Sequence, residues 1–191
     1  MEQVRSFVAI ELPEDAQDRL AIIQQQLRHG AEQGVKWVDP RGVHLTLKFL
    51  GNVPAAKLPE IEQALRVSVP AYLPLRLGLG EVGAFPSVRS PRVIWVGLRG
   101  EIDRLAALQD AVERALEPLG FSREGRAFAP HLTLGRAREG ISLEERRRVS
   151  ESIGNVSRVG DLSFEVVSIV VMRSQLTRKG AIYSPITTIS R

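Results

Sequence analysis

His44-Leu45-Thr46-Leu47 and His131-Leu132-Thr133-Leu134 are two copies of one tetrapeptide in a chain of 191 residues. The chain has only three histidines, and two of them stand in these copies, 87 residues apart. Successive side chains of a β-strand point to opposite faces, so the leucines of each copy are predicted to face a core. The histidine and the threonine then share the other face. We therefore expect two strands that each present an imidazole and a hydroxyl on one face.

The elements predicted around the first copy recur around the second. In the first half, a strand at 7–10 is followed by a helix that starts at Pro13, and then by the first copy. In the second half, a strand at 93–96 and a helix at 101–119 precede the second copy. A shift of 87 residues lays strand on strand and helix on helix without a gap. This order indicates a duplicated strand–helix–strand lobe.

Further elements are predicted between and after the two halves. No low-complexity linker separates them, so we expect a single domain over residues 1–191 that is built of two pseudo-symmetric lobes. The additional elements are a helix at 58–67, a strand at 75–79, a charged helix at 142–153, a long apolar strand at 164–172 and a last strand at 182–189.

The composition sets limits on the class of protein. With 43% hydrophobic and 25% charged residues it is typical of a globular chain. The absence of cysteine excludes disulfides, thiolate catalysis and cysteine-based zinc sites. The formal net charge of +4 suits an anionic substrate, although a basic surface without a special partner explains it equally well. There is no signal peptide pattern, and the longest apolar stretch, 166–172, is too short to span a bilayer. We therefore expect a cytoplasmic protein with no membrane contact. We also expect it to be a monomer.

The two histidines suit acid–base chemistry on a phosphodiester. Histidine titrates near neutrality, so one ring of a pair can be neutral while the other is protonated. Hydrolysis needs a base to activate water and an acid to protonate the leaving oxygen, and His44 and His131 together supply both. The hydroxyls of Thr46 and Thr133 would donate hydrogen bonds to the non-bridging oxygens and stabilise the transition state. This scheme requires no metal and no cofactor.

Cations close to the two copies are candidates for phosphate binding. Arg136 follows the second copy, and a guanidinium there would bind two phosphate oxygens at once. Arg138 lies two residues further along on the same side. Lys48, placed by strict alternation on the face of His44 and Thr46, is a weaker candidate for the same task.

Aromatic side chains are scarce and are candidates for stacking on a nucleobase. Trp37 and Phe85 each stand beside loop-forming residues and are predicted to line the mouth of a cleft. Tyr183 is a third candidate for a base or cleft contact. Trp95 lies in an apolar run and is predicted to belong to the core.

A zinc site is the main alternative interpretation of the histidines. Zinc takes three or four protein ligands, and His29 would have to be the third nitrogen. His29 follows a predicted helix, where a cationic side chain interacts favourably with the helix dipole and the last carbonyls. That placement explains His29 without a metal, and we expect none.

Longer stretches around the two copies resemble the 2H phosphoesterase superfamily, and within it the RNA 2′,3′-cyclic phosphodiesterases, also called 2′-5′ RNA ligases. The resemblance covers essentially the whole chain. The family often has alanine where this chain has Gly135. The matching stretches are RSFVAI at 5–10, VHLTLKFLG at 43–51, PRVIWVG at 91–97, PHLTLGR at 130–136, and a closing hairpin formed by SQL at 174–176 and GAIY at 180–183.

The resemblance implies a bilobal α+β fold in which two antiparallel sheets face each other across a cleft. Helices would pack outside, with one His-x-Thr motif per lobe. It also implies the opening of 2′,3′-cyclic phosphate at RNA ends to a 2′-phosphomonoester, with His44 as proton donor and His131 as proton acceptor. Two alternatives stay open on the sequence, namely an RNA-end-binding protein with little catalysis and 2′-5′ RNA ligation as the reverse reaction.

Overall fold

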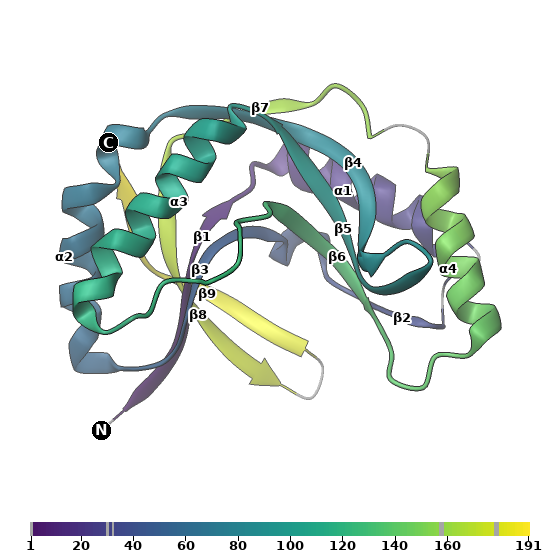
Figure 1. Cartoon of the computed structure of the whole chain (residues 1–191), viewed down its shortest axis with the longest axis horizontal. Coiled ribbons are helices and arrows are strands. Elements are labelled where there is room, and N and C mark those ends of the chain that lie inside the picture. Colours follow the sequence, from purple (N-terminus) through teal and green to yellow (C-terminus); the bar gives the residue numbers. More distant parts are fainter. Residues whose placement is uncertain (1, 30, 32, 157–158, 178–179) are drawn as a thin grey trace.

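The computed structural model describes residues 2–29, 31, 33–156, 159–177 and 180–191 (Figure 1). The described α-helices are α1 (Glu14–Arg28), α2 (Leu58–Ser68), α3 (Ile102–Leu116) and α4 (Leu143–Asn155). The described strands are β1 (Gln3–Glu11), β2 (Val35–Trp37), β3 (His44–Pro54), β4 (Leu75–Ser87), β5 (Ser90–Gly100), β6 (His131–Ala137), β7 (Ser163–Val166), β8 (Ser168–Thr177) and β9 (Gly180–Ser190).

The helices begin where local signals favour a helix start. Pro13 precedes α1, and the acidic Glu14 and Asp15 occupy its first turn, where they interact favourably with the helix dipole. A capping box begins α4, because the Ser142 hydroxyl accepts a hydrogen bond from the Glu145 amide at 3.1 Å and the Glu145 carboxylate accepts one from the Ser142 amide at 2.9 Å. These signals were readable in the sequence, and the predicted helices are confirmed.

The strands form two antiparallel sheets. The order is β3-β1-β8-β9 in the first sheet and β2-β6-β5-β4-β7 in the second. His44 begins β3 and His131 begins β6, so each sheet holds one copy of the tetrapeptide. The predicted α+β architecture with two antiparallel sheets is confirmed. Among the described residues, no helix is long and apolar enough to cross a membrane.

The two halves of the chain are interlocked. The strand β2, from the first half, pairs with β6, and β8 from the C-terminal part pairs with β1. The helix α1 follows β1 of the first sheet but contacts α4, which in turn contacts β5 of the second sheet. The helix α3 follows β5 of the second sheet but contacts β3 of the first, and it lies beside α2 in Figure 1. The helix α1 of the first half therefore lies on the side of the sheet that contains the second tetrapeptide, and α3 of the second half packs on the sheet that contains the first.

The apolar run predicted as one strand at 164–172 is two strands in different sheets, so that prediction is wrong. The strand β7 pairs with β4, whereas β8 pairs with β1. Val167 stands between them with 55% of its surface exposed, at the point where the chain changes sheets. A continuous apolar run carries no signal for such a crossing, because both strands bury apolar side chains.

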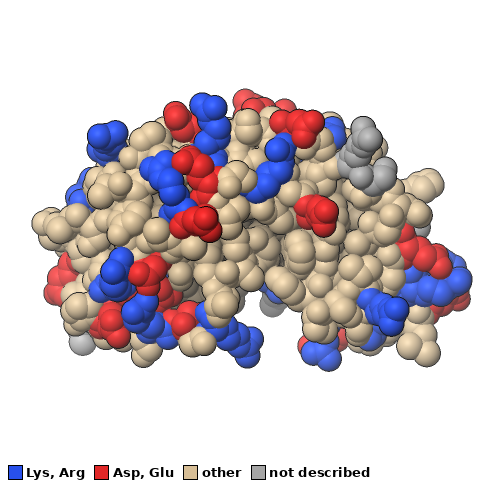
Figure 2. Space-filling view, turned by 45° about the horizontal axis from the view of Figure 1, so that its top comes forward, with Lys and Arg blue, Asp and Glu red and all other residues tan. Residues whose placement is uncertain are grey.

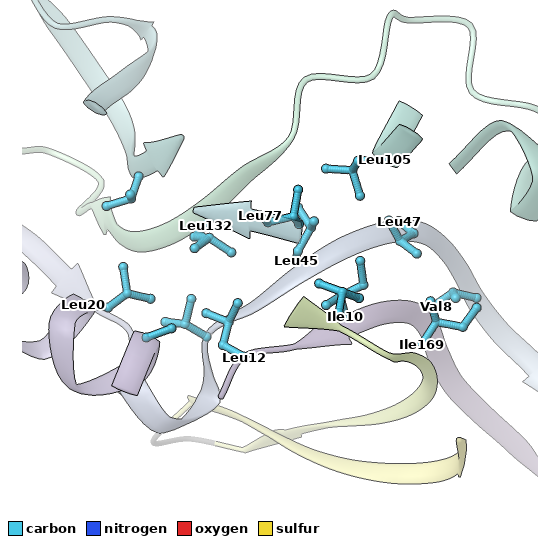
Figure 3. Packing of buried hydrophobic residues seen from close by; sticks show 14 of the residues in the cluster. Val8, Ile10, Leu12, Leu20, Leu45, Leu47, Leu77, Leu105, Leu132 and Ile169 are labelled. Atoms are coloured by element: carbon cyan, nitrogen blue, oxygen red, sulfur yellow. The ribbon is translucent and has the colours of Figure 1, made fainter. Parts of the chain in front are cut away.

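One large apolar core joins the two sheets. Leu45 and Leu47 of the first copy and Leu132 and Leu134 of the second belong to the same buried cluster, and none of them is more than 4% exposed. Figure 3 shows Leu45 and Leu132 within this cluster, although they come from different sheets. Burial of each leucine side chain contributes roughly 1.5–3 kcal/mol. The predicted inward direction of the leucines is confirmed.

Each of the two copies contains a β-bulge at the same place. In β3, Thr46 pairs with Ala9 and Lys48 with Val8, so Leu47 is an extra residue. In β6, Thr133 pairs with Trp95 and Gly135 with Ile94, so Leu134 is the extra residue. A bulge places two consecutive residues opposite one and reverses the alternation beyond it. The residues after the second leucine therefore lie on the opposite face from the one that strict alternation predicts.

The bulges also show that the repeat is not uniform. Ala9 of β1 pairs with Thr46, and Trp95 of β5 pairs with Thr133, so Ala9 and Trp95 are equivalent. The strands β1 and β5 therefore correspond with a shift of 86 residues. The tetrapeptides themselves superimpose with a shift of 87. The gapless alignment of the two halves is therefore wrong by one residue in the first strand.

Gly135 lets β2 approach β6 closely. A methyl group at Gly135 would lie 2.7 Å from Val35 Cγ1 and 3.0 Å from Trp37 Cε3. Val35 is buried and β-branched, so its side chain has little freedom to move aside. We expect Gly135→Ala to lower the free energy of unfolding by about 1–3 kcal/mol in urea denaturation, because the site becomes overpacked.

Gly154→Ala in α4 is the matched control for this substitution. A methyl group at Gly154 would meet nothing within 4 Å. Alanine in place of an unstrained helical glycine should stabilise the protein by about 0.4–1 kcal/mol. Equal unfolding midpoints for Gly135→Ala and the wild type would mean that the contact with Val35 does not limit the position.

Candidate active site

The polar residues of the two copies share one face of the molecule. His44 and Thr46 are half-buried on β3, as are His131 and Thr133 on β6. The strands β3 and β6 contact each other although they belong to different sheets. Figure 2 shows an indentation in the lower edge of the molecule, with Lys or Arg side chains on both of its rims. The arrangement brings two imidazoles and two hydroxyls to adjacent strands.

Both imidazoles are held in the same way by the backbone. The Nδ1 atom of His44 lies 2.9 Å from the carbonyl oxygen of Gly42, and the Nδ1 atom of His131 lies 2.8 Å from that of Ala129. A carbonyl oxygen only accepts, so each Nδ1 carries a proton and donates it. The Nε2 atom of each ring is then left to exchange a proton with a substrate or a water. The sequence offered no sign of these two contacts.

Aromatic rings pack against both histidines and restrict their orientation. The ring of His44 lies 4.6 Å from that of Phe7 and 4.8 Å from that of Tyr183, measured between centroids. The ring of His131 lies 5.0 Å from that of Phe85 in an edge-on arrangement. Phe85 and Tyr183, two of the predicted aromatic candidates, thus contact the histidines directly, whereas Phe7 was not identified from the sequence.

Burial lowers the pKa of His44 from its ordinary value, and the hydrogen bond to Gly42 opposes this only partly. A ring removed from water loses more solvation energy in its charged form than in its neutral form. His44 in the ligand-free protein therefore favours the neutral state. An anion bound beside the ring would act in the opposite direction, because an adjacent negative charge stabilises the imidazolium.

The two tryptophans lie on the opposite faces from those predicted. The face that carries His44, Thr46, His131 and Thr133 is the candidate catalytic face. Trp37 points away from it, like the buried Val35 two residues before it, and the guanidinium of Arg28 in α1 lies 5.7 Å from the Trp37 ring. Trp95 shares the face of Thr133, its direct partner across the sheet. Gly83 leaves room for the Trp95 ring, which lies against Phe85. Trp95 therefore belongs to the catalytic face, and Trp37 packs against the core and α1.

Lys48 does not lie on the catalytic face. Its Nζ atom lies 2.5 Å from Glu113 Oε2 in α3, and both side chains are only 5% exposed. The same ammonium group donates a hydrogen bond to the carbonyl of Ser122 at 2.8 Å. The bulge at Leu47 turns Lys48 toward the core. The prediction that Lys48 binds a phosphate is therefore wrong.

The bulges place Arg136 and Phe49 on the catalytic face. Arg136 is exposed beyond the bulge in β6, and Phe49 is its counterpart in β3, with 71% of its surface exposed. The ring of Phe49 lies 6.0 Å from that of Phe7, which itself contacts His44. Strict alternation would have turned both side chains toward the core. The sequence analysis missed Phe49 for that reason. The available signal was its equivalence to Arg136, since the two residues occupy the same position relative to the two tetrapeptides.

Glutamine side chains from two helices bind the bulged residues. The carbonyl of Leu134 accepts hydrogen bonds from Gln24 Nε2 of α1 at 3.0 Å and from the amide of Val38 at 2.9 Å. The carbonyl of Leu47 accepts a longer one, 3.4 Å, from Gln109 Nε2 of α3. Sequence reasoning missed these residues. The available signal was a glutamine within the apolar stripe of α1, four residues after Leu20.

His29 lies apart from the two other histidines. It is the C-cap residue of α1, where its backbone amide donates to the carbonyl of Gln26. Within the described ranges, no three His, Asp or Glu side chains gather in a way that could hold a metal ion. The donor set that a zinc site requires is therefore not found among these residues.

The chain matches one protein family twice. The family described as LigT like Phosphoesterase matches residues 10–95 and again residues 96–183. The two matches cover most of the chain and follow each other directly. They confirm the duplication that the repeated tetrapeptide indicated.

Relatives and solved structures cover nearly the whole chain. It is 35% identical over 182 residues to the RNA 2′,3′-cyclic phosphodiesterase of Methanothermobacter thermautotrophicus, covering 95% of this chain and 96% of that protein. It is 36% identical over 185 residues to the RNA 2′,3′-cyclic phosphodiesterase of Archaeoglobus fulgidus, covering 94% and 96%. The structure of TT0787 from Thermus thermophilus superimposes with a TM-score of 0.78 at 28% identity over 97% of each chain. That of E. coli LigT complexed with 3′-AMP gives 0.76 at 27% identity over 99% and 98%.

The hydrogen bonds of Gln24 can be tested by removing its amide without changing its length. Gln24→Met leaves the buried carbonyl of Leu134 with one donor fewer and also removes the bond to the Val38 carbonyl. We expect the free energy of unfolding to fall by about 1–3 kcal/mol in urea denaturation. Gln25→Met, at the exposed neighbouring position, should change it by less than about 0.5 kcal/mol. Equal effects of the two substitutions would contradict the role given to Gln24.

The lowered pKa of His44 makes stability depend on pH. The unfolded chain binds a proton at His44 near the ordinary pKa of about 6.5, and the folded chain binds it only at lower pH. Stability linked to His44 is therefore present above that pH and is lost as the pH falls through the folded pKa. We expect the fall in melting temperature from about pH 7.5 to about pH 5.5 to be smaller in His44→Gln than in the wild type. The control is His29→Gln, at an exposed site, which should behave as the wild type does.

Proposed function

Because the chain belongs to the LigT-like phosphoesterase family, and is an RNA 2′,3′-cyclic phosphodiesterase as its relatives are, we propose a specific reaction for it. It opens the 2′,3′-cyclic phosphate at RNA 3′ ends to a 2′-phosphomonoester by metal-independent acid–base catalysis. The observation that carries this proposal is the pair of imidazoles on adjacent strands, each held through Nδ1 by a backbone carbonyl. Two rings with free Nε2 atoms suit a reaction that takes up one proton and delivers another.

The proton transfers follow from this arrangement. His131 Nε2 accepts a proton from a water molecule, whose oxygen attacks the phosphorus. The bond between phosphorus and the 3′ oxygen breaks, and His44 Nε2 donates its proton to that oxygen. The product keeps the phosphate on the 2′ oxygen. The two roles are assigned by the family resemblance, since the backbone contacts of the two rings are equivalent.

The remaining residues act on the charge of the phosphate. The hydroxyls of Thr46 and Thr133 donate hydrogen bonds to the non-bridging oxygens, where negative charge accumulates in the transition state. The guanidinium of Arg136 adds a permanent positive charge on the same face. The bound phosphate also raises the proton affinity of His44, which offsets the effect of burial and keeps the acid protonated.

The reaction is tested with an oligoribonucleotide that ends in a 2′,3′-cyclic phosphate, in the presence and absence of EDTA. We expect complete conversion to the 2′-monophosphate at a rate that EDTA does not change. A 3′-monophosphate product would overturn the assigned leaving oxygen, and inhibition by EDTA would restore the zinc interpretation. RNA binding without turnover would favour the RNA-end-binding alternative, and joining to a 5′-hydroxyl RNA would identify the ligation reaction.

The individual groups are tested by substitution in the same assay. His44→Ala and His131→Ala should each abolish turnover while the protein stays folded. Thr46→Ala and Thr133→Ala should each lower the rate on the order of a hundredfold, as the loss of one preorganised donor does. Wild-type activity in His29→Ala is the expected control, because His29 lies at the end of α1.

The acid and the base are distinguished with a phosphodiester that carries a p-nitrophenolate leaving group. This group departs without a proton, so catalysis no longer needs the acid. We expect His44→Ala to retain most of the wild-type activity on this substrate and His131→Ala to retain little. The opposite result would exchange the two roles.

A further inference from the structure

Two positive charges lie next to each other on the catalytic face, further along β6 than Thr133. Lys36 of β2 pairs directly with Arg136 of β6. Directly opposite residues of an antiparallel pair point to the same face of the sheet, so both side chains lie on the catalytic face. Both residues are exposed. None of the ion pairs among the described residues includes Lys36 or Arg136.

The position of Lys36 is fixed by the core. Its neighbours Val35 and Trp37 point to the opposite face, where Val35 is almost fully buried and Trp37 packs against the core. The close contact of both side chains with Gly135 sets the register of this short strand. Like charges directly opposite each other in a sheet destabilise it. The fold nevertheless holds Lys36 beside Arg136, which is the arrangement expected of a site that receives an anion.

This anion is not the reacting phosphate alone. Thr133 pairs with Trp95 and Arg136 pairs with Val93, so the two residues are two strand positions apart, because the bulged Leu134 adds no position of its own. This corresponds to roughly 7 Å along β6. Lys36 lies on the neighbouring strand, about 4.8 Å further to the side. Along the backbone, Arg136 is thus located between Thr133, which is proposed to bind the reacting phosphate, and the strand that carries Lys36. A ligand that reaches Lys36 carries a second negative charge at some distance from the first.

We propose that Lys36, together with Arg136, binds the phosphodiester that links the terminal nucleotide of the RNA to the preceding one. This inference rests on the proposed function, since it concerns the substrate of the same site. An RNA chain has a negative charge at every nucleotide, whereas a nucleoside 2′,3′-cyclic phosphate has only the reacting one. The enzyme therefore selects chain ends over mononucleotides, and Lys36 determines this preference.

Three substrates separate the reacting phosphate from the second one. They are a nucleoside 2′,3′-cyclic phosphate, a dinucleotide that ends in 2′,3′-cyclic phosphate, and the same dinucleotide with an uncharged methylphosphonate in place of its internal phosphate. For the wild type we expect kcat/KM to be about tenfold higher on the charged dinucleotide than on the other two substrates, because one charge-assisted contact contributes about that much. The difference should lie in a lower KM and not in a higher kcat. In Lys36→Gln this preference should largely disappear, with kcat and the mononucleotide kinetics unchanged. Lys36→Arg should retain the preference.

The matched control is Arg147→Gln, which removes one charge from the exposed face of α4. It should keep the wild-type preference, so a loss there would point to a general effect of net charge. Equal kcat/KM values of the wild type on all three substrates would overturn this inference and leave the proposed function standing. Equal losses of Lys36→Gln on all three would assign Lys36 to the reacting phosphate and also overturn it. If the wild type hydrolyses none of them, the proposed function itself fails.

Discussion

The extra residue in β3 and in β6, the two strands that carry the tetrapeptides, is the constraint on which the candidate site depends. At Leu47 and at Leu134 two consecutive residues of the strand face the core, and the strand then continues with its faces exchanged. A bulge leaves a backbone carbonyl without its regular partner in the ladder, and in a buried position an unpaired carbonyl is costly. Gln109 donates to the carbonyl of Leu47, and Gln24 donates to that of Leu134, which also accepts a hydrogen bond from the amide of Val38. Gln24 lies in α1, which follows β1 of the first sheet, and donates to β6 of the second. Gln109 lies in α3, which follows β5 of the second sheet, and donates to β3 of the first, so these contacts form only when the two halves are interlocked.

The same interlocking connects β3 and β6 to each other. Lys48 follows the bulge in β3, and its ion pair with Glu113 ties that strand to α3. Glu113 also accepts a hydrogen bond from the amide of Glu124, in the segment that leads to β6 and His131. Separation of a buried ion pair typically costs about 3–5 kcal/mol, because the remaining charge is left without a partner. The relative position of the two motifs is thus maintained by buried polar contacts as well as by the leucines of the shared core.

Equivalent positions of the two lobes carry different chemistry. Beyond the bulge, the first lobe presents the phenyl ring of Phe49 and the second the guanidinium of Arg136. One step earlier, Lys48 is buried in an ion pair, while Gly135 has no side chain and allows β2 to approach with Lys36. Duplication of the fold therefore gives two similar histidines, and the residues around each bulge make one side of the site apolar and the other positively charged.

The sequence by itself determined the repeated motif, the helices, the inward leucines and the common face of each histidine and its threonine, because period and residue type are local properties. The tertiary structure decided which face the residues after each motif occupy. Strict alternation misplaced Lys48, and the apolar context misplaced Trp95, since a bulge and a change of face leave no mark in the hydrophobic pattern. The division of the run at 164–172 between two sheets, and the pairing of Lys36 with Arg136, likewise depend on strands far apart in the chain. Long-range pairing sets register, and register alone decides which side chains meet.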